Sequence, residues 1–374
     1  MIATDKFYQS LTQNGVEFFS GVPDSLLKDI CAYITDHTPK EKNIIAANEG
    51  GAIALATGYH LASGKVPLVY MQNSGLGNTV NPLLSLTDAE VYSIPMLLMV
   101  GWRGEPGIKD EPQHIKQGKV TLDLLDVMKI PYAILPDDID SATKVIKEAG
   151  AYANKTSAPF ALIVKKGTFE SYKLKNTSQT SFQLSREEAI KEVVRNLNKT
   201  DIVISTTGMT SRELFEYRKE LGQSHENDFL TVGSMGHANQ IALGIALAKP
   251  NRNVYCFDGD GAILMHTGSL GIIGDLAPKN FKHIIFNNGA HDSVGGQPTI
   301  GFNTNFGKIA EAFNYKKVYK VDTVNDLKDC FKQFKTTQGP TLLEISVNKG
   351  ARKDLGRPTT TPLQNKQAFM RNLK

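Results

Sequence analysis

The chain has 374 residues, which is too long for one ordinary hydrophobic core and suits two domains. Its 41% hydrophobic and 21% charged residues are typical of a globular protein, and no apolar run approaches the roughly 20 residues needed to span a membrane, so we expect a soluble protein without a membrane partner. A net charge of +4, with no basic run interleaved with aromatic residues, argues against a nucleic-acid partner.

The N-terminal segment and the cysteines indicate a cytoplasmic protein. The segment MIATDKFYQSL is polar and amphipathic, without the basic start and apolar core of a secretory signal. Cys31, Cys256 and Cys330 are far apart and odd in number, which favours three buried thiols over a disulfide framework or a cysteine metal site.

Strand-like and helix-like segments alternate along the chain, which is typical of an α/β fold with parallel sheets. In the first half, six short apolar runs are predicted to be strands, with helices in the gaps. These runs are 17–20, 43–46, 67–71, 95–100, 132–135 and 161–164.

The segment 171–185 is polar, rich in Ser, Thr and Gln and free of apolar periodicity, so we predict an interdomain linker there. One domain is expected over 1–170 and another over 186–374, each a doubly wound parallel sheet. The second domain is predicted to open with a helix over 186–197. Its strands are predicted at 202–205, 229–231, 253–257, 283–286, 317–320 and 341–345.

Polar residues follow two consecutive predicted strands of the second domain. Gly259-Asp260-Gly261-Ala262 follows the strand 253–257, and Asn287-Asn288 follows the strand 283–286, with a helix predicted between them over 263–276. A right-handed crossover between parallel strands places both groups at the carboxyl edge of the sheet. Carboxylate and amide oxygens suit Mg²⁺, for which a diphosphate is the natural co-ligand.

Two nucleotide-binding patterns fail on spacing. Leu264 stands where a dinucleotide fingerprint starting at Gly259 needs a third glycine. Five residues separate Gly58 from Gly64 where a Walker-type phosphate loop has four, and Val66 replaces its Ser or Thr. Neither stretch is predicted to bind a nucleotide.

Residues 255–262, together with Asn287-Asn288, resemble the thiamine diphosphate signature of the α-keto acid decarboxylase superfamily. The resemblance implies that Asp260, the Asn288 side chain and the Ala290 main-chain carbonyl hold Mg²⁺ against the diphosphate. The alternative is an acidic turn that opens a helix. Further cofactor contacts implied by the resemblance are Thr207, Gly208, Thr210, Gly233, Ser234, Gly259, Gly261 and Ala262, although Thr207 to Thr210 also suit an ordinary helix N-cap.

Met235 lies in a loop, 233–238, that resembles the superfamily segment supporting the cofactor from below. There a bulky side chain bends the cofactor into a V, which brings the aminopyrimidine nitrogen near the thiazolium C2 and makes proton transfer intramolecular. The alternative is that Met235 only fills the core.

Glu49 follows a predicted strand and opens a helix, where a carboxylate is also favoured by the helix dipole alone. The superfamily has a Glu at this place that hydrogen-bonds the cofactor's pyrimidine ring. Because this Glu and the diphosphate site lie in different domains, which in relatives meet across a subunit interface, the resemblance implies a homodimer or larger homo-oligomer.

Six segments resemble the phosphonopyruvate decarboxylase family nearly end to end: 21–25, 72–75, 101–107, 109–114, 287–299 and 350–359. The resemblance implies two domains without a middle domain, and decarboxylation of a small anionic 2-oxo acid, 3-phosphonopyruvate, to phosphonoacetaldehyde and CO₂. Candidate phosphonate ligands are Arg103, Lys109, Arg352 and Arg357, since a phosphonate needs cations. Candidates for substrate contact are Ser25 and Gln72, and Asp24, His114 and His291 are candidates for substrate contact or catalytic proton transfer.

Two alternatives stay open at this point. A sulfopyruvate decarboxylase would share these motifs and act on a sulfonate of lower charge. A noncatalytic protein that retains thiamine diphosphate is also compatible, although the presence of both Glu49 and Asp260 argues against it.

Overall fold

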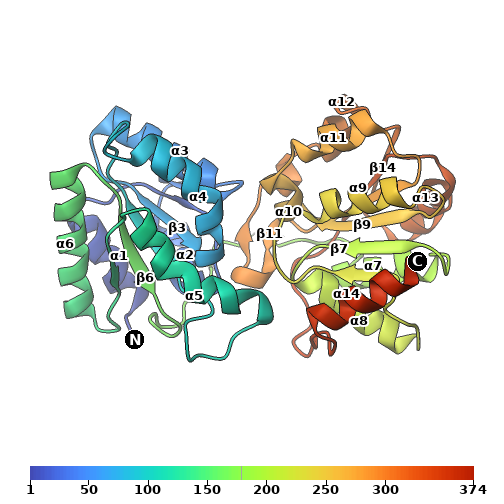
Figure 1. Ribbon diagram of the computed structural model, residues 1–374, viewed down its shortest axis with the longest axis horizontal. Helices are drawn as coiled ribbons and strands as arrows, with labels where there is room; N and C mark the ends of the chain where they lie inside the picture. The colour runs from blue at the N-terminus through green and yellow to red at the C-terminus, as the bar shows by residue number, and fades with distance from the viewer. Residues whose placement is uncertain (178) are drawn as a thin grey trace. The chain divides into compact units, whose positions relative to one another are not determined.

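The computed structural model describes residues 1–177 and 179–374, which form two compact units (Figure 1). Unit 1 consists of Met1–Thr177 and Val294–Gln297, and unit 2 of Ser178–Ser293 and Pro298–Lys374. The predicted linker 171–185 includes residue 178, which lies outside the described residues. Its residues 171–177 belong to unit 1 and its residues 179–185 to unit 2.

Unit 1 is built on a parallel sheet of six strands in the order β2-β1-β3-β4-β6-β5. The strands β3, β4 and β6 are buried on both faces, which explains why they are nearly continuous apolar runs in the sequence. In the pairing register, Gln72, Gly101 and Val164 align across three neighbouring strands. The strands are β1 (Phe19–Gly21), β2 (Asn43–Ile45), β3 (Leu68–Gln72), β4 (Leu97–Gly101), β5 (Tyr132–Ile134) and β6 (Phe160–Val164).

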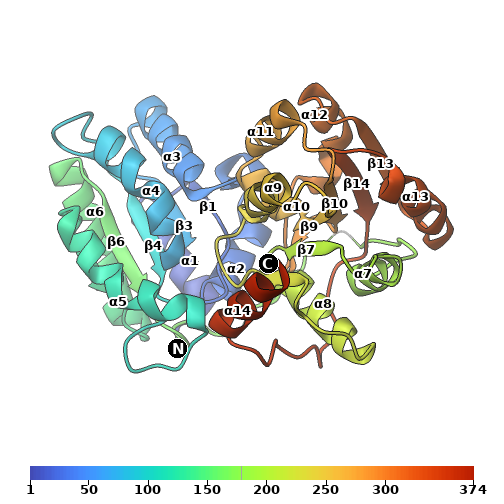
Figure 2. The same cartoon turned by 45° about the vertical axis from the view of Figure 1, so that its right-hand side comes forward.

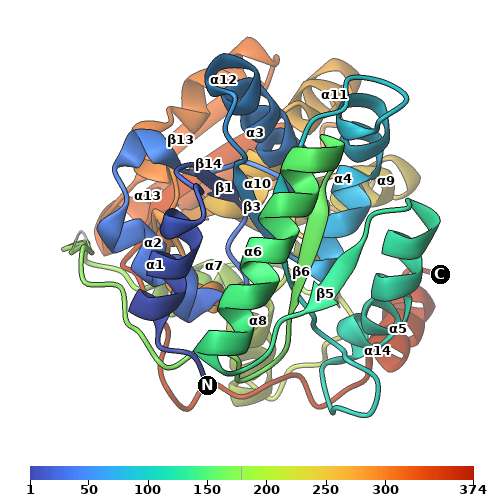
Figure 3. The same cartoon turned by 90° about the vertical axis from the view of Figure 1, so that its left-hand side faces the viewer.

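Helices cover both faces of this sheet (Figure 3). Side chains of α1, α2 and α6 pack in one core, and those of α3, α4 and α5 pack in the other. The strands divide their residues between the two: Leu68 and Tyr70 face the first core, and Val69 and Met71 face the second, as the two-residue period of a strand requires. The helices are α1 (Thr4–Gln13), α2 (Lys28–His37), α3 (Glu49–Ser63), α4 (Leu76–Pro82), α5 (Pro112–Val127) and α6 (Ile139–Thr156).

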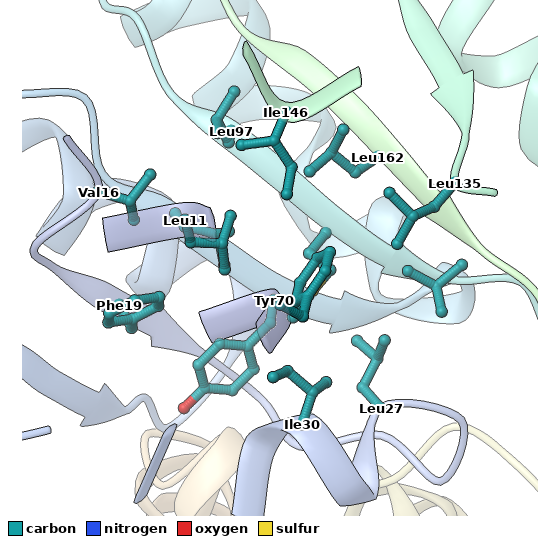
Figure 4. Packing of buried hydrophobic residues seen from close by; sticks show 14 of the residues in the cluster. Leu11, Val16, Phe19, Leu27, Ile30, Tyr70, Leu97, Leu135, Ile146 and Leu162 are labelled. Atoms are coloured by element: carbon teal, nitrogen blue, oxygen red, sulfur yellow. The ribbon is translucent and has the colours of Figure 1, made fainter. Parts of the chain in front are cut away.

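The first core shows how strand and helix residues interlock (Figure 4). Phe19 and Tyr70 from the sheet meet Leu11 and Ile30 from the helices, and all four are at most 1% exposed. The Tyr70 hydroxyl donates to Asn43 Oδ1 at 3.1 Å, so the one polar atom of this ring is satisfied. Burial of each such large apolar side chain stabilises the fold by about 1.5 to 3 kcal/mol.

Unit 2 contains a second parallel sheet of six strands, in the order β13-β14-β10-β9-β7-β8 (Figure 2). Helices α7, α8 and α13 pack on one face, and α9, α11, α12 and α14 pack on the other. The strands are β7 (Ile202–Ser205), β8 (Asp228–Leu230), β9 (Val254–Gly259), β10 (Phe281–Asn287), β13 (Lys317–Val321) and β14 (Thr341–Ser346). The helices are α7 (Arg186–Arg195), α8 (Met209–Glu220), α9 (Ala238–Ala248), α10 (Asp260–Met265), α11 (Ser269–Leu276), α12 (Phe306–Ala312), α13 (Val324–Thr336) and α14 (Pro362–Asn372).

The two sheets have the same topology. When the six long strands of unit 2 are numbered in chain order, both sheets read 2-1-3-4-6-5. The α/β fold class with two doubly wound parallel sheets is therefore confirmed, and all twelve predicted strands are present. A two-residue pair, β11 (Ala290–His291) and β12 (Gln297–Pro298), was not predicted. No helix among the described residues is long and apolar enough to cross a membrane.

Two predictions about local structure need correction. The single helix predicted over 263–276 is two helices, α10 and α11, with a break at His266 (φ −139°, ψ 50°). There Thr267 Oγ1 donates to the Ile263 carbonyl at 3.1 Å and Ser269 Oγ donates to the His266 carbonyl at 2.7 Å, so side chains compete with the helical pattern. In addition, Cys330 is only half-buried, whereas Cys31 and Cys256 are buried free thiols as predicted.

Candidate active site

The predicted metal-binding residues come together at the carboxyl edge of the unit 2 sheet. Strands β9 and β10 pair in parallel, with Phe286 opposite Gly259. Asp260 and Asn287 directly follow these paired residues, so they lie side by side at the end of the two strands. The strand order predicted for this β-α-β unit therefore delivers the acidic loop and the asparagine pair to one place.

Asp260 is buried, with 1% of its surface exposed, at the first position of α10. Its carboxylate accepts hydrogen bonds from the Thr299 hydroxyl and the main-chain N–H of Asn288. Burial outweighs these bonds and raises the pKa of Asp260 to about 6. Among the described residues no Lys, Arg or His pairs with this carboxylate, so its environment suits a bound cation.

The two asparagines have different surroundings. The Asn287 side chain donates to the Gly301 carbonyl at 3.0 Å and to Glu344 Oε1 at 2.9 Å, and its Oδ1 accepts from the Gly289 N–H at 3.2 Å. Asn288 Oδ1 accepts only from the Ala290 N–H, at 3.1 Å, among the hydrogen bonds of the described residues. An amide oxygen has two lone pairs, so Asn288 Oδ1 keeps one for a cation, whereas Asn287 is occupied in fixing the loop.

Asp292 orients the side chain of Asn288 by accepting a hydrogen bond from its amide nitrogen. Its Oδ2 accepts from Asn288 Nδ2 at 2.6 Å, from Arg186 Nη1 at 3.0 Å and from the Gly350 N–H at 3.0 Å. Arg186 is buried and also forms two hydrogen bonds with Glu213, at 2.8 and 3.0 Å. Because Asn288 Nδ2 donates to Asp292, the network points Asn288 Oδ1 away from Asp292. The sequence analysis did not predict these supporting contacts.

Met235 and His291 both lie against Gly261, next to Asp260. A Cβ at Gly261 would be 3.4 Å from Met235 Cε and 3.0 Å from His291 Cε1. Met235 is half-buried, and burial lowers the pKa of His291 to about 4, so this imidazole is neutral near pH 7. The partial exposure of Met235 is unlike that of a residue that only fills the core.

The predicted diphosphate segment begins α8. Gly208 is the N-cap, at φ 91° and ψ −138°, and no side chain caps the helix. The Thr207 hydroxyl instead donates to the Val232 carbonyl at 2.9 Å, and Thr210 is buried in the first turn. The N-cap residue therefore offers no capping side chain, which was the alternative for this segment. Among the described residues the first N–H groups of α8 have no side-chain acceptor, which suits an anion.

The neighbouring loop 233–238 reaches the same helix as the metal loop. Ser234 has a left-handed backbone, with φ 53°, and Gly236 follows at φ 87°. A Cβ at Gly236 would be 3.1 Å from the Ala262 carbonyl, which places this loop directly against α10. Gly233 and Ser234 thus lie two residues and one residue before Met235, in a tight turn.

A buried polar cluster lies on the neighbouring strands β9 and β10, and two of its residues precede Asp260 in the chain. Ligand atoms of Cys256, Asp258 and His283 are all within 4.8 Å of one another, and each residue is fully buried. His283 Nε2 lies 3.3 Å from Asp258 Oδ2, and its Nδ1 lies 3.3 Å from the Tyr315 hydroxyl. Burial raises the pKa of the Cys256 thiol, so the thiol is neutral in this network.

In unit 1, Glu49 is the first residue of α3 and is 5% exposed. Its Oε2 accepts from Asn78 Nδ2 at 2.7 Å, and a Cβ at Gly75 would be 2.5 Å from its Oε1. The helix is capped by Asn48, whose side chain accepts from the Gly51 N–H at 2.8 Å. Helix capping was the alternative role predicted for Glu49, and Asn48 performs it instead.

Asp24 is fully buried in the loop after β1. Its carboxylate accepts from Gln72 Nε2 at 2.5 Å and from the Leu26 N–H at 2.9 Å. Burial outweighs these bonds and raises the pKa of Asp24. Two predicted site residues, Asp24 and Gln72, are therefore in direct contact, and His114 is buried near the start of α5.

Three of the predicted substrate residues line one cavity of about 220 Å³ in unit 1. They are Ser25, Arg103 and Lys109. Arg103 donates through Nε to Asp110 at 2.8 Å and through Nη1 to Ser25 Oγ at 2.6 Å, and its Nη2 contacts the second oxygen of Asp110. The cavity therefore has a fixed polar wall.

The other two predicted phosphonate ligands are in unit 2. Arg352 pairs with Glu187, Glu216 and Asp354, and Arg357 is exposed. The three carboxylates neutralise the charge of Arg352, so this residue lacks the free charge expected of a phosphonate ligand.

Family models match both parts of the chain. Residues 1–127 match the N-terminal thiamine pyrophosphate (thiamine diphosphate) binding domain of thiamine pyrophosphate enzymes, and residues 206–345 match the C-terminal one. The chain belongs to the thiamine pyrophosphate enzyme family. Of the predicted site residues of this thiamine pyrophosphate enzyme, Glu49 lies within the first matched domain. Met235, Asp260 and Asn288 lie within the second.

Relatives match over almost the whole chain. Phosphonopyruvate decarboxylase of Streptomyces viridochromogenes is 33% identical, covering 99% of this chain and 94% of the relative. That of Streptomyces hygroscopicus is 34% identical, covering 99% and 93%. A sulfopyruvate decarboxylase of Methanosarcina acetivorans is 25% identical, covering 92% and 91%. Among solved structures, a putative thiamin diphosphate-dependent enzyme from Mycobacterium smegmatis covers 94% of this chain at 14% identity and a TM-score of 0.40.

Proposed function

We propose that this thiamine pyrophosphate enzyme is a Mg²⁺-dependent decarboxylase that converts 3-phosphonopyruvate to phosphonoacetaldehyde and CO₂. The observation that carries the substrate is the full-length likeness to two phosphonopyruvate decarboxylases, at higher identity than to the full-length sulfopyruvate decarboxylase. The absence of a cationic partner for the buried Asp260 carboxylate among the described residues supports the metal.

Asp260, Asn288 Oδ1 and the Ala290 carbonyl would hold Mg²⁺ against the diphosphate. A hard cation favours these oxygen ligands and keeps phosphate oxygens in its remaining positions. The segment Thr207-Gly208 and the first turn of α8 would bind the same anion, because the first N–H groups of α8 have no side-chain acceptor among the described residues. Asn287 and Asp292 keep the two asparagine side chains in place.

Bound thiamine diphosphate supplies the electron sink for the electron pair left on the former carbonyl carbon when CO₂ departs. Glu49 would hold a proton at the pyrimidine ring through its carboxylate. Asn78 and the close approach of Gly75 fix that carboxylate, so it loses little freedom on binding the ring. Met235 would support the cofactor from below. Asp24, His114 and His291 are the candidates for proton transfer to the product.

The test of this function is aldehyde release by the purified protein with thiamine diphosphate and Mg²⁺, using phosphonopyruvate, sulfopyruvate and pyruvate in parallel. We expect the highest kcat/KM with phosphonopyruvate. A higher value with sulfopyruvate would reassign the substrate. No release from any of the three would favour a noncatalytic thiamine diphosphate-binding protein.

We further propose that the enzyme acts in the cytoplasm as a homodimer or larger homo-oligomer, with each active site formed by Glu49 of one subunit and Asp260 of another. Mixing the inactive variants Glu49→Gln and Asp260→Asn tests this arrangement. In a mixed dimer one of the two sites would then contain neither substitution, so remixing at equal amounts should restore about a quarter of the wild-type rate. If both residues of each site came from one subunit, mixing would restore nothing.

A further inference from the structure

The charged side chains that line the cavity of unit 1 lie on two segments, each of which follows a sheet strand. Arg103 and Lys109 come after β4, and Lys166 comes after β6. Gly101 of β4 and Val164 of β6 are paired in register, so Arg103 and Lys166 stand at matching places, each two residues beyond the pair. The sheet thus delivers two cations to one edge of the cavity.

Arg103 is not a free cation. Two of its nitrogens contact the two oxygens of Asp110, and a third donates to Ser25 Oγ. Burial opposes the ionised form of Asp110, but hydrogen bonds from Arg103 and from the N–H groups of Glu111 and Gly104 outweigh it and lower the pKa of Asp110. Arg103 and Asp110 therefore form a neutral pair that positions the Ser25 hydroxyl.

Glu105 is neutralised in the same way. Its carboxylate contacts Lys165 Nζ, which also lies 5.7 Å from the ring centroid of Trp102. Of the two consecutive lysines after β6, Lys165 is thus occupied by an anion and an aromatic face. Glu105 and Asp110 are the two carboxylates of the cavity wall, and each already has its own cation.

Lys109 and Lys166 are left as the two uncompensated cations of the wall. Both are exposed, and neither ammonium has an ion pair or hydrogen bond with the part of the chain that the structure describes. An open cavity with two unpaired ammonium groups and a fixed hydroxyl suits a compact anion with a charge of −2.

We propose that Lys109 and Lys166, with the Ser25 hydroxyl, bind the terminal phosphonate of the substrate and make the enzyme prefer a phosphonate dianion to a sulfonate monoanion. This inference rests on the proposed function and goes beyond it, because it assigns the substrate preference to two named charges. Arg103 becomes a positioning residue rather than the phosphonate ligand. A monoanionic sulfonate leaves one of the two ammonium charges uncompensated, so it gains less from the same wall.

Binding of two unreactive anions to the holoenzyme tests the proposal without turnover. Phosphonoacetate and sulfoacetate share a carbon skeleton and lack the reacting ketone. By calorimetry we expect Lys166→Gln and Lys109→Gln each to weaken phosphonoacetate binding about 10- to 100-fold, and sulfoacetate binding much less. Lys166→Arg, which keeps the charge, should restore most of the affinity. Lys147→Gln, on the exposed surface of α6, is the matched control and should change neither.

The same variants should lower kcat/KM for phosphonopyruvate more than for sulfopyruvate, so that the ratio of the two falls about 10-fold or more. Equal losses for the two anions, no loss in either lysine variant, or wild-type holoenzyme that binds the two anions equally would overturn the proposal. If the wild-type enzyme decarboxylates neither substrate, the proposed function fails, and the binding measurement still decides the role of the lysines.

Discussion

The loops that follow the third and fourth strands occupy the same topological place in both units but carry different chemistry. In unit 2 they hold Asp260 and Asn288, which are 1% and 4% exposed. In unit 1 the third strand ends at Gln72, and the loop after the fourth strand holds the segment from Trp102 to Lys109, which borders an open cavity. A shared strand order therefore fixes where ligands are bound, whereas the local side chains decide what is bound.

The difference in burial has an electrostatic consequence. The buried carboxylate of Asp260 is in a medium of low effective dielectric constant, where a cation is held strongly but the empty site is costly. The lysines of the cavity stay in water, so they attract an anion at a low cost of desolvation, and salt screens them. We expect substitution of the buried metal ligand Asp260 to abolish cofactor binding, and substitutions of the cavity lysines to lower substrate affinity by degrees.

The largest effect is expected for Asp260→Asn. The substitution removes the charged metal ligand, and we expect kcat/KM to fall by about 10³-fold or more, together with the calorimetric signal of Mg²⁺ and thiamine diphosphate binding. Asp329→Asn, an exposed aspartate on α13, is the matched control and should retain both. Near-normal cofactor affinity in Asp260→Asn would contradict the proposal that this loop binds Mg²⁺ and the diphosphate.

Glu49→Gln should be nearly as damaging to turnover but should spare binding. The amide keeps the shape of the side chain and loses the charge that holds a proton at the pyrimidine ring, so we expect kcat to fall about 10²- to 10⁴-fold. Calorimetry should show cofactor affinity within a few-fold of wild type, and NMR should show slow deuterium exchange at the thiazolium C2. Glu41→Gln, exposed before β2, serves as the control. Wild-type turnover in Glu49→Gln would remove Glu49 from the mechanism.

A smaller effect should follow from Gly301→Ala, which tests how tightly the unit 2 loop is packed. The added Cβ would be 2.3 Å from Asp260 Oδ2 and 2.6 Å from Asn287 Oδ1, so these side chains must move. We expect Mg²⁺ affinity to drop about 10-fold while the circular dichroism spectrum stays unchanged. Gly244→Ala, which has open space around its Cβ, should leave the affinity unaltered. Equal affinities in the two variants would show that the loop yields easily.

The smallest effect concerns pH and Asp24. Its pKa is raised in the folded protein by burial, so the folded state binds a proton more tightly than the unfolded state does. Stability from this group is therefore present below the unfolded pKa and is lost as pH rises through the folded one. In urea melts between pH 4 and 7, Asp24→Asn should show a shallower fall in the free energy of unfolding than wild type. Parallel curves would contradict the raised pKa.

Much of the fold was predictable because the central strands of both sheets are buried, mainly apolar runs bounded by polar loops. The break at His266 was not, since it depends on where the Thr267 and Ser269 hydroxyl groups donate. The metal loop was predictable because its residues are near one another in sequence and follow strands.

The supporting contacts of the site were not predictable, because they join distant segments. Arg186 and Asp292 are 106 residues apart, and Asn78 reaches Glu49 from another helix. Likewise, Arg103 was one of four predicted phosphonate ligands, and only its contacts with Asp110 show that its charge is already neutralised. Which of two consecutive lysines is free, Lys165 or Lys166, also depends on the position of Glu105.

Each unit has its own complete sheet with a hydrophobic core on both faces. The two units could therefore be encoded by one gene or by two. A break in the gene between the two sheets would leave every hydrophobic core intact on one product or the other. Sulfopyruvate decarboxylases of Methanocaldococcus jannaschii are named as separate alpha and beta subunits, which match 42% and 44% of this chain. One continuous polypeptide has a different advantage, since it guarantees that the two halves are made in equal number.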